Sequence, residues 1–272
     1  MTKRIGQLQK MSVMHSDPIQ YHLPLAGSVL MNDYLGQKLT LKFTGLITCI
    51  ACKRVIKKSY HQGHCFPCTQ KLASCDFCIL KPETCHFHNG TCREPEWGMA
   101  NCFIPHIVYL ANSSGIKVGI TRETQIPTRW IDQGAVQALA IFRLKSRYQA
   151  GLLEVEIAKL IADKTDWRKM LRGENGVEDL KATRDYLFSH LAEKIQEIAG
   201  KFKFGEFEFL TAEQQKIFKY PVLEYPQQIK SLSFDKTPQI SGILQGIKGQ
   251  YLIFDCGVIN IRSCTGYDVE II

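Results

Sequence analysis

The chain has 272 residues, of which 45% are hydrophobic and 22% charged, so it can supply the cores of two or three small domains. This composition excludes a wholly disordered chain, and the longest apolar stretches are too short to span a bilayer. The 34 basic and 26 acidic residues give a net charge of +8, which favours nucleic acid or another anionic partner, although many ordinary enzymes carry as much. No apolar run follows Lys3 and Arg4, so we expect a cytoplasmic protein without a secretory signal or a membrane segment.

We expect an α+β fold in five segments, because the sequence texture and the Gly and Pro punctuation change along the chain. The segments are an N-terminal β segment at 1–46, a zinc-binding module at 47–104, an α/β domain at 105–172, a helix with a connector at 173–230, and a small antiparallel C-terminal β unit at 231–272.

The first twenty residues are polar and weakly patterned, so we interpret them as a tail or a short first strand. The alternation of Leu39, Leu41 and Phe43 predicts a half-buried strand that leads into the first cysteines.

Nine of the eleven cysteines lie between Cys49 and Cys102, in a stretch rich in turn-forming residues. An intracellular chain keeps its thiols reduced, so this density favours metal ligation over disulfides. Cys49-x2-Cys52 and Cys65-x2-Cys68 are knuckles at zinc-ribbon or treble-clef spacing, and each presents two sulfurs to one ion. We therefore predict a closed structural Zn²⁺ site with these four ligands. A redox role for a single CxxC motif is the alternative.

A second zinc site is predicted around the knuckle Cys75-x2-Cys78. An all-thiolate set is the simplest closed site, and it is completed by Cys85 and Cys92. The sequence leaves other ligands open, namely His86, His88, Cys102 and His106.

Basic residues dominate this stretch, where Asp76 is the one acid between Lys42 and Lys81. They either offset the negative charge of a zinc ion held by four thiolates, or bind nucleic acid together with the aromatic residues Tyr60 and Phe66. The sequence supports both interpretations equally.

The central segment has the pattern of an α/β unit. Residues 107–110 and 117–120 are predicted to form two short strands, joined by the turn-rich residues 112–115. Residues 129–140 have mixed helical and extended character, and residues 149–162 are predicted to form an amphipathic helix.

This unit contains several short motifs, namely Val108-Tyr109-Leu110, Lys117-Val118-Gly119-Ile120-Thr121, Arg129 and Leu153-Glu154. Together they resemble the GIY-YIG nucleases, and more closely the divergent branch whose second strand reads Lys-Ile-Gly. The resemblance covers about residues 106–165 and implies a GIY-YIG-like fold there.

Two neighbouring strings carry a second resemblance, namely Gly90-Thr91-Cys92-Arg93-Glu94-Pro95 and Arg129-Trp130-Ile131-Asp132-Gln133-Gly134-Ala135. They are similar to a bacterial family known as domain of unknown function 2797. This resemblance covers most of the chain and implies no established activity.

The nuclease resemblance implies that Tyr109 assists the nucleophile, Arg129 holds the phosphate and Glu154 ligates Mg²⁺ or Mn²⁺. Lys117 stands where those enzymes have their second tyrosine, so it neutralises phosphate without acting as a phenolic relay. Glu156 is the other carboxylate beside the apolar stripe of the helix, and the family spacing favours Glu154. Each candidate also has a purely structural alternative. Tyr109 would be a core aromatic residue, Arg129 an ion-pair partner, Glu154 a solvated carboxylate and Lys117 an edge-strand lysine.

The string around Arg129 also predicts contacts with a base. Trp130 and Gln133 offer a ring and an amide suited to stacking and hydrogen bonding, and Arg122 extends a basic track. Burial of Trp130 as a packing residue is the alternative.

The last third of the chain is predicted to contain a helix at about 177–199, followed by a connector and short strands. The strands are expected at 242–244, 250–254 and 258–261. Residues 36–41 resemble residues 249–254, so the two ends form related β units, join one sheet, or resemble each other by chance.

These patterns favour a zinc-stabilised protein that engages DNA or RNA. Tyr109, Arg129 and Glu154 favour a metal-dependent endonuclease. Lys117 favours a non-catalytic DNA- or RNA-binding protein with a degenerate nuclease fold. A zinc-knuckle adaptor for a protein partner is the third interpretation.

Overall fold

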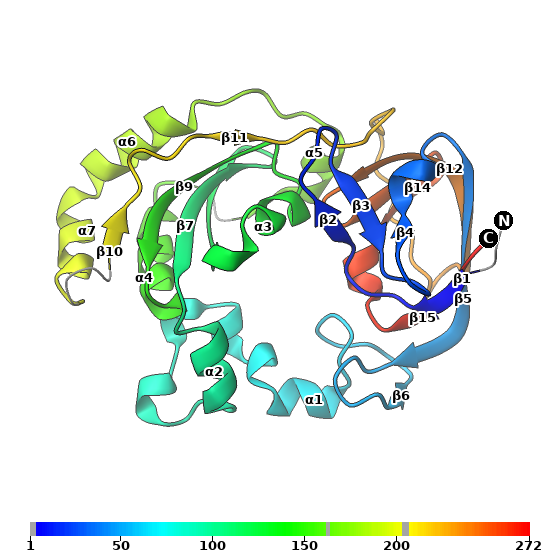
Figure 1. The fold of residues 1–272 in the computed structure, drawn as a ribbon, viewed down its shortest axis with the longest axis horizontal. Coiled ribbons are helices and arrows are strands. Elements are labelled where there is room, and N and C mark those ends of the chain that lie inside the picture. Colours follow the sequence, from blue (N-terminus) through cyan, green and yellow to red (C-terminus); the bar gives the residue numbers. More distant parts are fainter. Residues whose placement is uncertain (1–3, 162–163, 203–206) are drawn as a thin grey trace. The chain divides into compact units, whose positions relative to one another are not determined.

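The computed structural model describes residues 4–161, 164–202 and 207–272. The chain divides into two compact units made of discontinuous segments (Figure 1). Unit 1 contains Met1–Lys71, Leu171–Gly173 and Phe218–Ile272, and unit 2 contains Leu72–Met170 and Glu174–Ile217. The structure therefore groups the chain differently from the five predicted segments. The predicted zinc-binding module is divided after Lys71, and both ends of the chain belong to unit 1.

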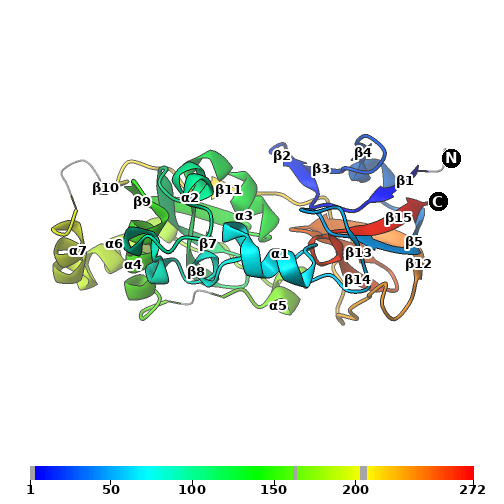
Figure 2. The same ribbon diagram turned by 90° about the horizontal axis from the view of Figure 1, so that it is seen from below.

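Unit 1 is built on a seven-stranded antiparallel sheet in the order β1-β15-β5-β12-β13-β14, with β6 paired to β5 (Figure 2). A three-stranded sheet, β2-β3-β4, accompanies it. The strands are β1 (Arg4–Gln7), β2 (Ser12–Met14), β3 (Gln20–Leu23), β4 (Val29–Leu30), β5 (Lys38–Thr48), β6 (Val55–Ile56), β12 (Gln239–Lys248), β13 (Tyr251–Phe254), β14 (Gly257–Asn260) and β15 (Tyr267–Ile271), and helix α1 (Phe66–Lys71) also belongs to unit 1.

The predicted strand at Leu39 is confirmed as the long strand β5, in which Leu39 and Leu41 are fully buried. β5 pairs with both β15 and β12, so it joins the two ends of the chain. The similar segments 36–41 and 249–254 contribute to this one sheet through β5 and β13, which is the second of the three alternatives raised by the sequence.

Unit 2 contains a five-stranded sheet in the order β10-β9-β7-β8, with β11 also paired to β9. The two strands predicted before and after the turn at 112–115 are confirmed as β7 and β8. Its strands are β7 (His106–Asn112), β8 (Ile116–Arg122), β9 (Gln137–Leu144), β10 (Phe207–Phe209) and β11 (Lys216–Ile217), and its helices are α2 (Pro95–Asn101), α3 (Thr128–Asp132), α4 (Arg147–Ile157), α6 (Leu180–His190) and α7 (Ala192–Ala199). Helix α5 (Trp167–Leu171) ends at the boundary of the two units.

The hydrophobic core of unit 2 lies on one face of this sheet, under α4, α6 and α7 (Figure 1). Val108 and Leu110 of β7 face this core, whereas Tyr109 faces α3 on the opposite side, where its ring lies 5.8 Å from that of Trp130. Successive side chains of a strand point to opposite faces of the sheet. The packing residues of β7 therefore lie on one face and the candidate functional residue Tyr109 on the other.

Helix α4 begins two residues earlier than predicted because Ser146 and Gln149 form a capping box. It ends at Ile157, and residue 162, the predicted end, lies outside the described residues. The helix predicted at 177–199 is two helices, because Leu191 leaves the helical conformation with φ −108° and ψ 13°. Among the described residues, no helix is long and apolar enough to cross a membrane.

His106, the first residue of β7, is fully buried, and its Nδ1 lies 2.7 Å from the carbonyl oxygen of Ile104. Its Nε2 has no hydrogen-bond partner among the described residues. Burial lowers the pKa of His106 from 6.5 to about 4, because a buried imidazolium loses its hydration. The imidazole is therefore neutral in the folded protein at neutral pH.

We predict that His106 makes folding sensitive to mild acid. Between pH 6.5 and 4 the unfolded chain binds a proton that the folded chain does not, so stability falls as the pH is lowered. Going from pH 7 to pH 5, the free energy of unfolding should fall by about 2 kcal/mol more in the wild type than in His106→Gln. Urea unfolding at the two pH values measures this difference, and equal pH dependence in both proteins would contradict it.

Candidate functional site

The first cysteine cluster is built where β5 ends and α1 begins. Cys49 follows β5, and the short strand β6 turns back onto β5, which holds the loop that carries Cys52. Cys65 directly precedes α1 and Cys68 lies in its first turn. The β5–β6 hairpin thus positions the first knuckle, and the start of α1 positions the second.

The four sulfurs of this cluster lie within 4.8 Å of one another. The Sγ atoms of Cys52 and Cys65 are 3.7 Å apart, and a tetrahedral zinc ion with bonds of about 2.3 Å requires sulfurs about 3.8 Å apart. The cluster can therefore hold a metal ion, and its geometry is consistent with structural zinc.

The thiols of this cluster have unequal proton affinities. Burial raises the pKa of Cys49, but hydrogen bonds from the backbone N–H groups around it outweigh burial and lower the pKa to about 6. The pKa of Cys68 is raised to about 12, first by its hydrogen bond with Cys65 and then by burial and the other thiols. Four adjacent thiolates repel one another, and a divalent cation removes this repulsion.

Gly63 has a role in the turn between the two knuckles that the sequence did not predict. Gly63 has φ +106°, and a Cβ on it would lie 2.9 Å from side-chain atoms of both Ile50 and Thr265. Its N–H bonds to the hydroxyl of Ser59, and its carbonyl accepts from the N–H of Ile50. Only glycine allows this approach of the second knuckle to the first, and a lone Gly in a loop gives no sequence signal for it.

The second group of cysteines surrounds a cavity in unit 2. Of the predicted ligands, Cys78, Cys85 and Cys92 line this cavity together with Cys102, whereas Cys75 is not among the residues that line it. Asp76, Cys78 and His86 form a second set of potential donors within 4.8 Å of one another.

The candidate catalytic residues come from three separate elements of unit 2. Tyr109 of β7 hydrogen-bonds with Arg129 of α3, and its hydroxyl lies 3.4 Å from Oε1 of Gln133. Glu154 of α4 lies within electrostatic range of both Tyr109 and Arg129. Burial raises the pKa of Tyr109, so its hydroxyl is protonated at neutral pH. Asp132 of α3 also interacts with Arg129 and is a further carboxylate of this cluster.

Gly119 makes room for the tyrosine. It lies opposite Tyr109 in the β7–β8 pair, and a Cβ on it would lie 2.6 Å from the Tyr109 hydroxyl. Lys117 lies two residues earlier on β8 and is 9% exposed, so this predicted site residue is mostly buried on the same face of the strand.

The residues predicted to contact a base differ in their exposure to solvent. Trp130 is only 2% exposed, with Tyr109 on one side and the ammonium of Lys216 6.0 Å from its ring. This position does not support the prediction that Trp130 stacks on a base, because its faces pack against protein. Gln133 is half-buried beside Tyr109, and the half-buried Arg122 donates to Oδ1 of Asn101 at 2.7 Å.

A comparison with known protein families matches most of the chain. The model of a family described as protein of unknown function (DUF2797) matches residues 36–269. The chain belongs to the DUF2797 family. The resemblance to this family is thus confirmed, whereas the nuclease resemblance stays a prediction. No curated protein and no solved structure matches this DUF2797 chain. The matched range includes both groups of cysteines and the cluster around Tyr109.

We predict that this DUF2797 protein binds zinc through the first cluster. Cys52→Ser should lower the zinc content by one ion per chain, because a closed site with three thiolates binds the ion far more weakly. Metal analysis of the purified protein measures this content. Cys256→Ser is the matched control, since Cys256 is also exposed and lies outside both groups. Equal zinc content in the two variants would contradict the site.

Proposed function

We propose that the chain is a zinc-stabilised nucleic-acid-binding protein that cleaves phosphodiester bonds at the cluster of Tyr109, Arg129 and Glu154. The observation that carries this proposal is that Tyr109 of β7 hydrogen-bonds with Arg129 of α3, and that both lie within electrostatic range of Glu154 of α4. They come from separate elements, and packing alone does not require a phenol, a guanidinium and a carboxylate to lie within electrostatic range of one another. Such clusters of interacting titratable groups mark functional sites.

Each residue has a defined task in this proposal. Arg129 binds a phosphate oxygen through its planar fork of N–H donors and stabilises the charge that develops on it. Tyr109 orients the attacking water from the hydrogen bond that it shares with Arg129. Lys117 adds a positive charge from β8.

Glu154 fits a magnesium or manganese ion that arrives with the substrate. These ions bind one or two carboxylates and complete their coordination with water and phosphate oxygens, so a single protein carboxylate is sufficient. When bound, such an ion would polarise the phosphate and activate water.

The proposal also includes a nucleic-acid-binding surface on unit 1, beside the first cysteine cluster. Lys57 and Lys58 are exposed there, and the ammonium of Lys58 lies 5.4 Å from the ring of Tyr60. Tyr60 and Phe66 are 40% and 58% exposed, with their rings 5.8 Å apart. Positive charge next to exposed aromatic rings suits a phosphate backbone with unstacked bases.

A non-catalytic nucleic-acid-binding protein is the second candidate, and one observation favours it. Tyr109 is only 1% exposed, so its hydroxyl reaches a substrate only if the neighbouring groups move. A nuclease fold that has lost its chemistry retains such a tyrosine as a packing residue.

We predict that the protein cleaves labelled DNA or RNA with Mg²⁺ or Mn²⁺. Glu154→Gln should reduce cleavage at least about 100-fold without weakening binding, because it removes only the carboxylate charge. Arg129→Lys should reduce both cleavage and binding, because lysine lacks the planar fork. Gels that resolve bound and cut single- and double-stranded substrates measure both effects.

Glu156→Gln is the matched control for this experiment. Glu156 lies on the same helix and is paired with Lys159 at 2.6 Å, so its replacement should leave cleavage unchanged. Equal cleavage by the two glutamine variants would exclude the proposed site. Binding without cleavage by the wild type would select the second candidate, and an absence of binding would reject both.

We predict that the unit 1 surface contributes to affinity. Lys57→Ala combined with Lys58→Ala should weaken binding of all substrates, and the slope of log affinity against log salt should become shallower by about 0.7–0.9 for each phosphate that the protein no longer neutralises. Fluorescence anisotropy at several salt concentrations measures this slope. Lys219→Ala is the control, because Lys219 is an exposed lysine of unit 1 that pairs with Asp17. An unchanged slope in the double variant would place the binding surface elsewhere.

A further inference from the structure

The segment from Leu72 to Pro105 has almost no interior of its own. It consists of the short helix α2 and several single turns of 3₁₀ helix. Every residue of this segment is described, and the buried ones are Ala73, Asp76, Pro82 and Gly98. None of these is a large apolar side chain, so hydrophobic burial does not explain why the segment is ordered.

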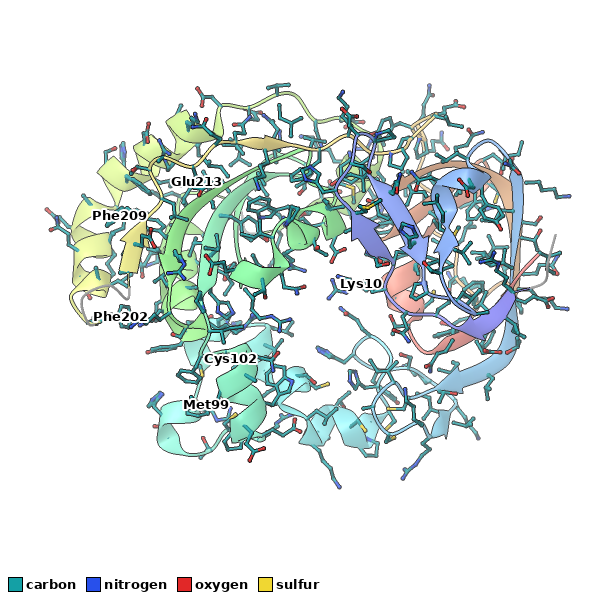
Figure 3. The ribbon with its side chains drawn as sticks, in the orientation of Figure 1. Lys10, Met99, Cys102, Phe202, Phe209 and Glu213 are labelled. Carbon is teal, nitrogen blue, oxygen red and sulfur yellow. The ribbon has the colours of Figure 1, made fainter. Side chains whose placement is uncertain are left out.

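Four cysteines occupy the place where a core would lie. Cys78, Cys85, Cys92 and Cys102 line one cavity of about 20 Å³. This is room for a single water molecule or ion. The thiols of Cys78 and Cys102 each lie within electrostatic range of both Cys85 and Cys92. These sulfurs are not gathered within 4.8 Å of one another as those of the first cluster are, so binding of an ion would draw them together. Figure 3 shows Cys102 between α2 and the start of β7.

A half-buried cation lies beside these thiols. Arg147, the first residue of α4, is within electrostatic range of Cys78 and Cys102. Its guanidinium donates to the carbonyl of Ile79 at 2.6 Å, while its buried Nε has no hydrogen-bond partner among the described residues. Glu154 already offsets part of this charge, and a zinc ion held by four thiolates would add a second negative charge beside it.

We propose that Cys78, Cys85, Cys92 and Cys102 bind a second structural metal ion of the zinc class. Cys75 is then not a ligand, although it belongs to the CxxC knuckle that the sequence favoured. The four ligands span the segment from its 3₁₀ turns to the start of β7, so one ion joins both ends of the segment.

Asp76 and His86 act as supporting groups in this arrangement. The carboxylate of Asp76 is held by Arg93 at 2.7 Å, and His86 approaches it at 3.5 Å. Nδ1 of His86 is 2.7 Å from the hydroxyl of Thr91. These interactions engage both side chains with protein partners and leave the thiols to face the cavity.

The second ion would also organise α4. The N–H of Arg147 bonds to the carbonyl of the ligand Cys102 at 2.7 Å, which fixes the start of the helix. Pro82 packs onto Gly151 one turn later, where an added Cβ would lie 2.5 Å from Pro82. Metal binding therefore orders the helix that carries Glu154.

The test is cysteine alkylation of the full-length, zinc-loaded chain, mapped by mass spectrometry. All five cysteines in question have intermediate exposure, so access alone does not separate them. Cys78, Cys85, Cys92 and Cys102 should react at least about tenfold more slowly than Cys75, because metal-bound thiolates are poor nucleophiles. A chelator should abolish the difference. Protection of Cys75 with labelling of Cys102 would overturn the proposed ligand set.

Zinc content gives the second measurement. Cys102→Ser should remove one ion per chain while the first cluster keeps its own, and Cys75→Ser should remove none. His86→Ala should also retain the second ion. Loss of an ion in Cys75→Ser or His86→Ala but not in Cys102→Ser would overturn the proposal. Equal alkylation of all five cysteines in the zinc-loaded wild type would show that no second ion is bound, whatever the variants do.

Discussion

The gathering of cysteine sulfurs into a cluster that could hold a metal ion is the constraint around which the cysteine-rich region of the chain is built. From Ile50 to Pro105 the buried residues are few and mostly small, although every residue there is described, so this stretch gains little from the hydrophobic effect. Binding of zinc by four thiolates contributes about 10–16 kcal/mol in small zinc modules, which exceeds what a few buried small side chains provide. A metal ion bound by these cysteines would therefore stabilise the region through a few directional bonds in place of a hydrophobic core.

Within unit 2, close backbone approaches transmit this order to the candidate site. Gly151 lets Pro82 lie directly on α4, and Gly119 lets the ring of Tyr109 lie directly on β8. Both approaches occur where any larger residue would collide with a rigid neighbour. The position of α4, which carries Glu154, therefore depends on the packing of the cysteine-rich segment, and the position of Tyr109 depends on the absence of a side chain at Gly119.

Local signals in the sequence predicted much of this structure. Strand alternation located β5, β7 and β8, and ligand spacing identified the first cysteine cluster, because both patterns act over a few residues. Non-local packing was not accessible in the same way. The break between α6 and α7 at Leu191 was not predicted, and the sequence left Cys102 open as one of several ligands, whereas the fold places it at the cavity. For Trp130 the sequence left base stacking and burial as alternatives, and only the structure shows that the side chain is buried.

The sheet of unit 1 has a consequence for synthesis on the ribosome. β15, near the end of the chain, pairs with β1 and β5 at the other end. These early strands therefore emerge long before their partner and present unpaired edges while all of unit 2 is being made. Unit 2 has its main strands in close succession and can fold during this interval. If unit 2 folds in this interval, the nascent chain carries a folded insert inside a still open sheet, and the unpaired edges of that sheet would be the place where a chaperone acts or aggregation begins.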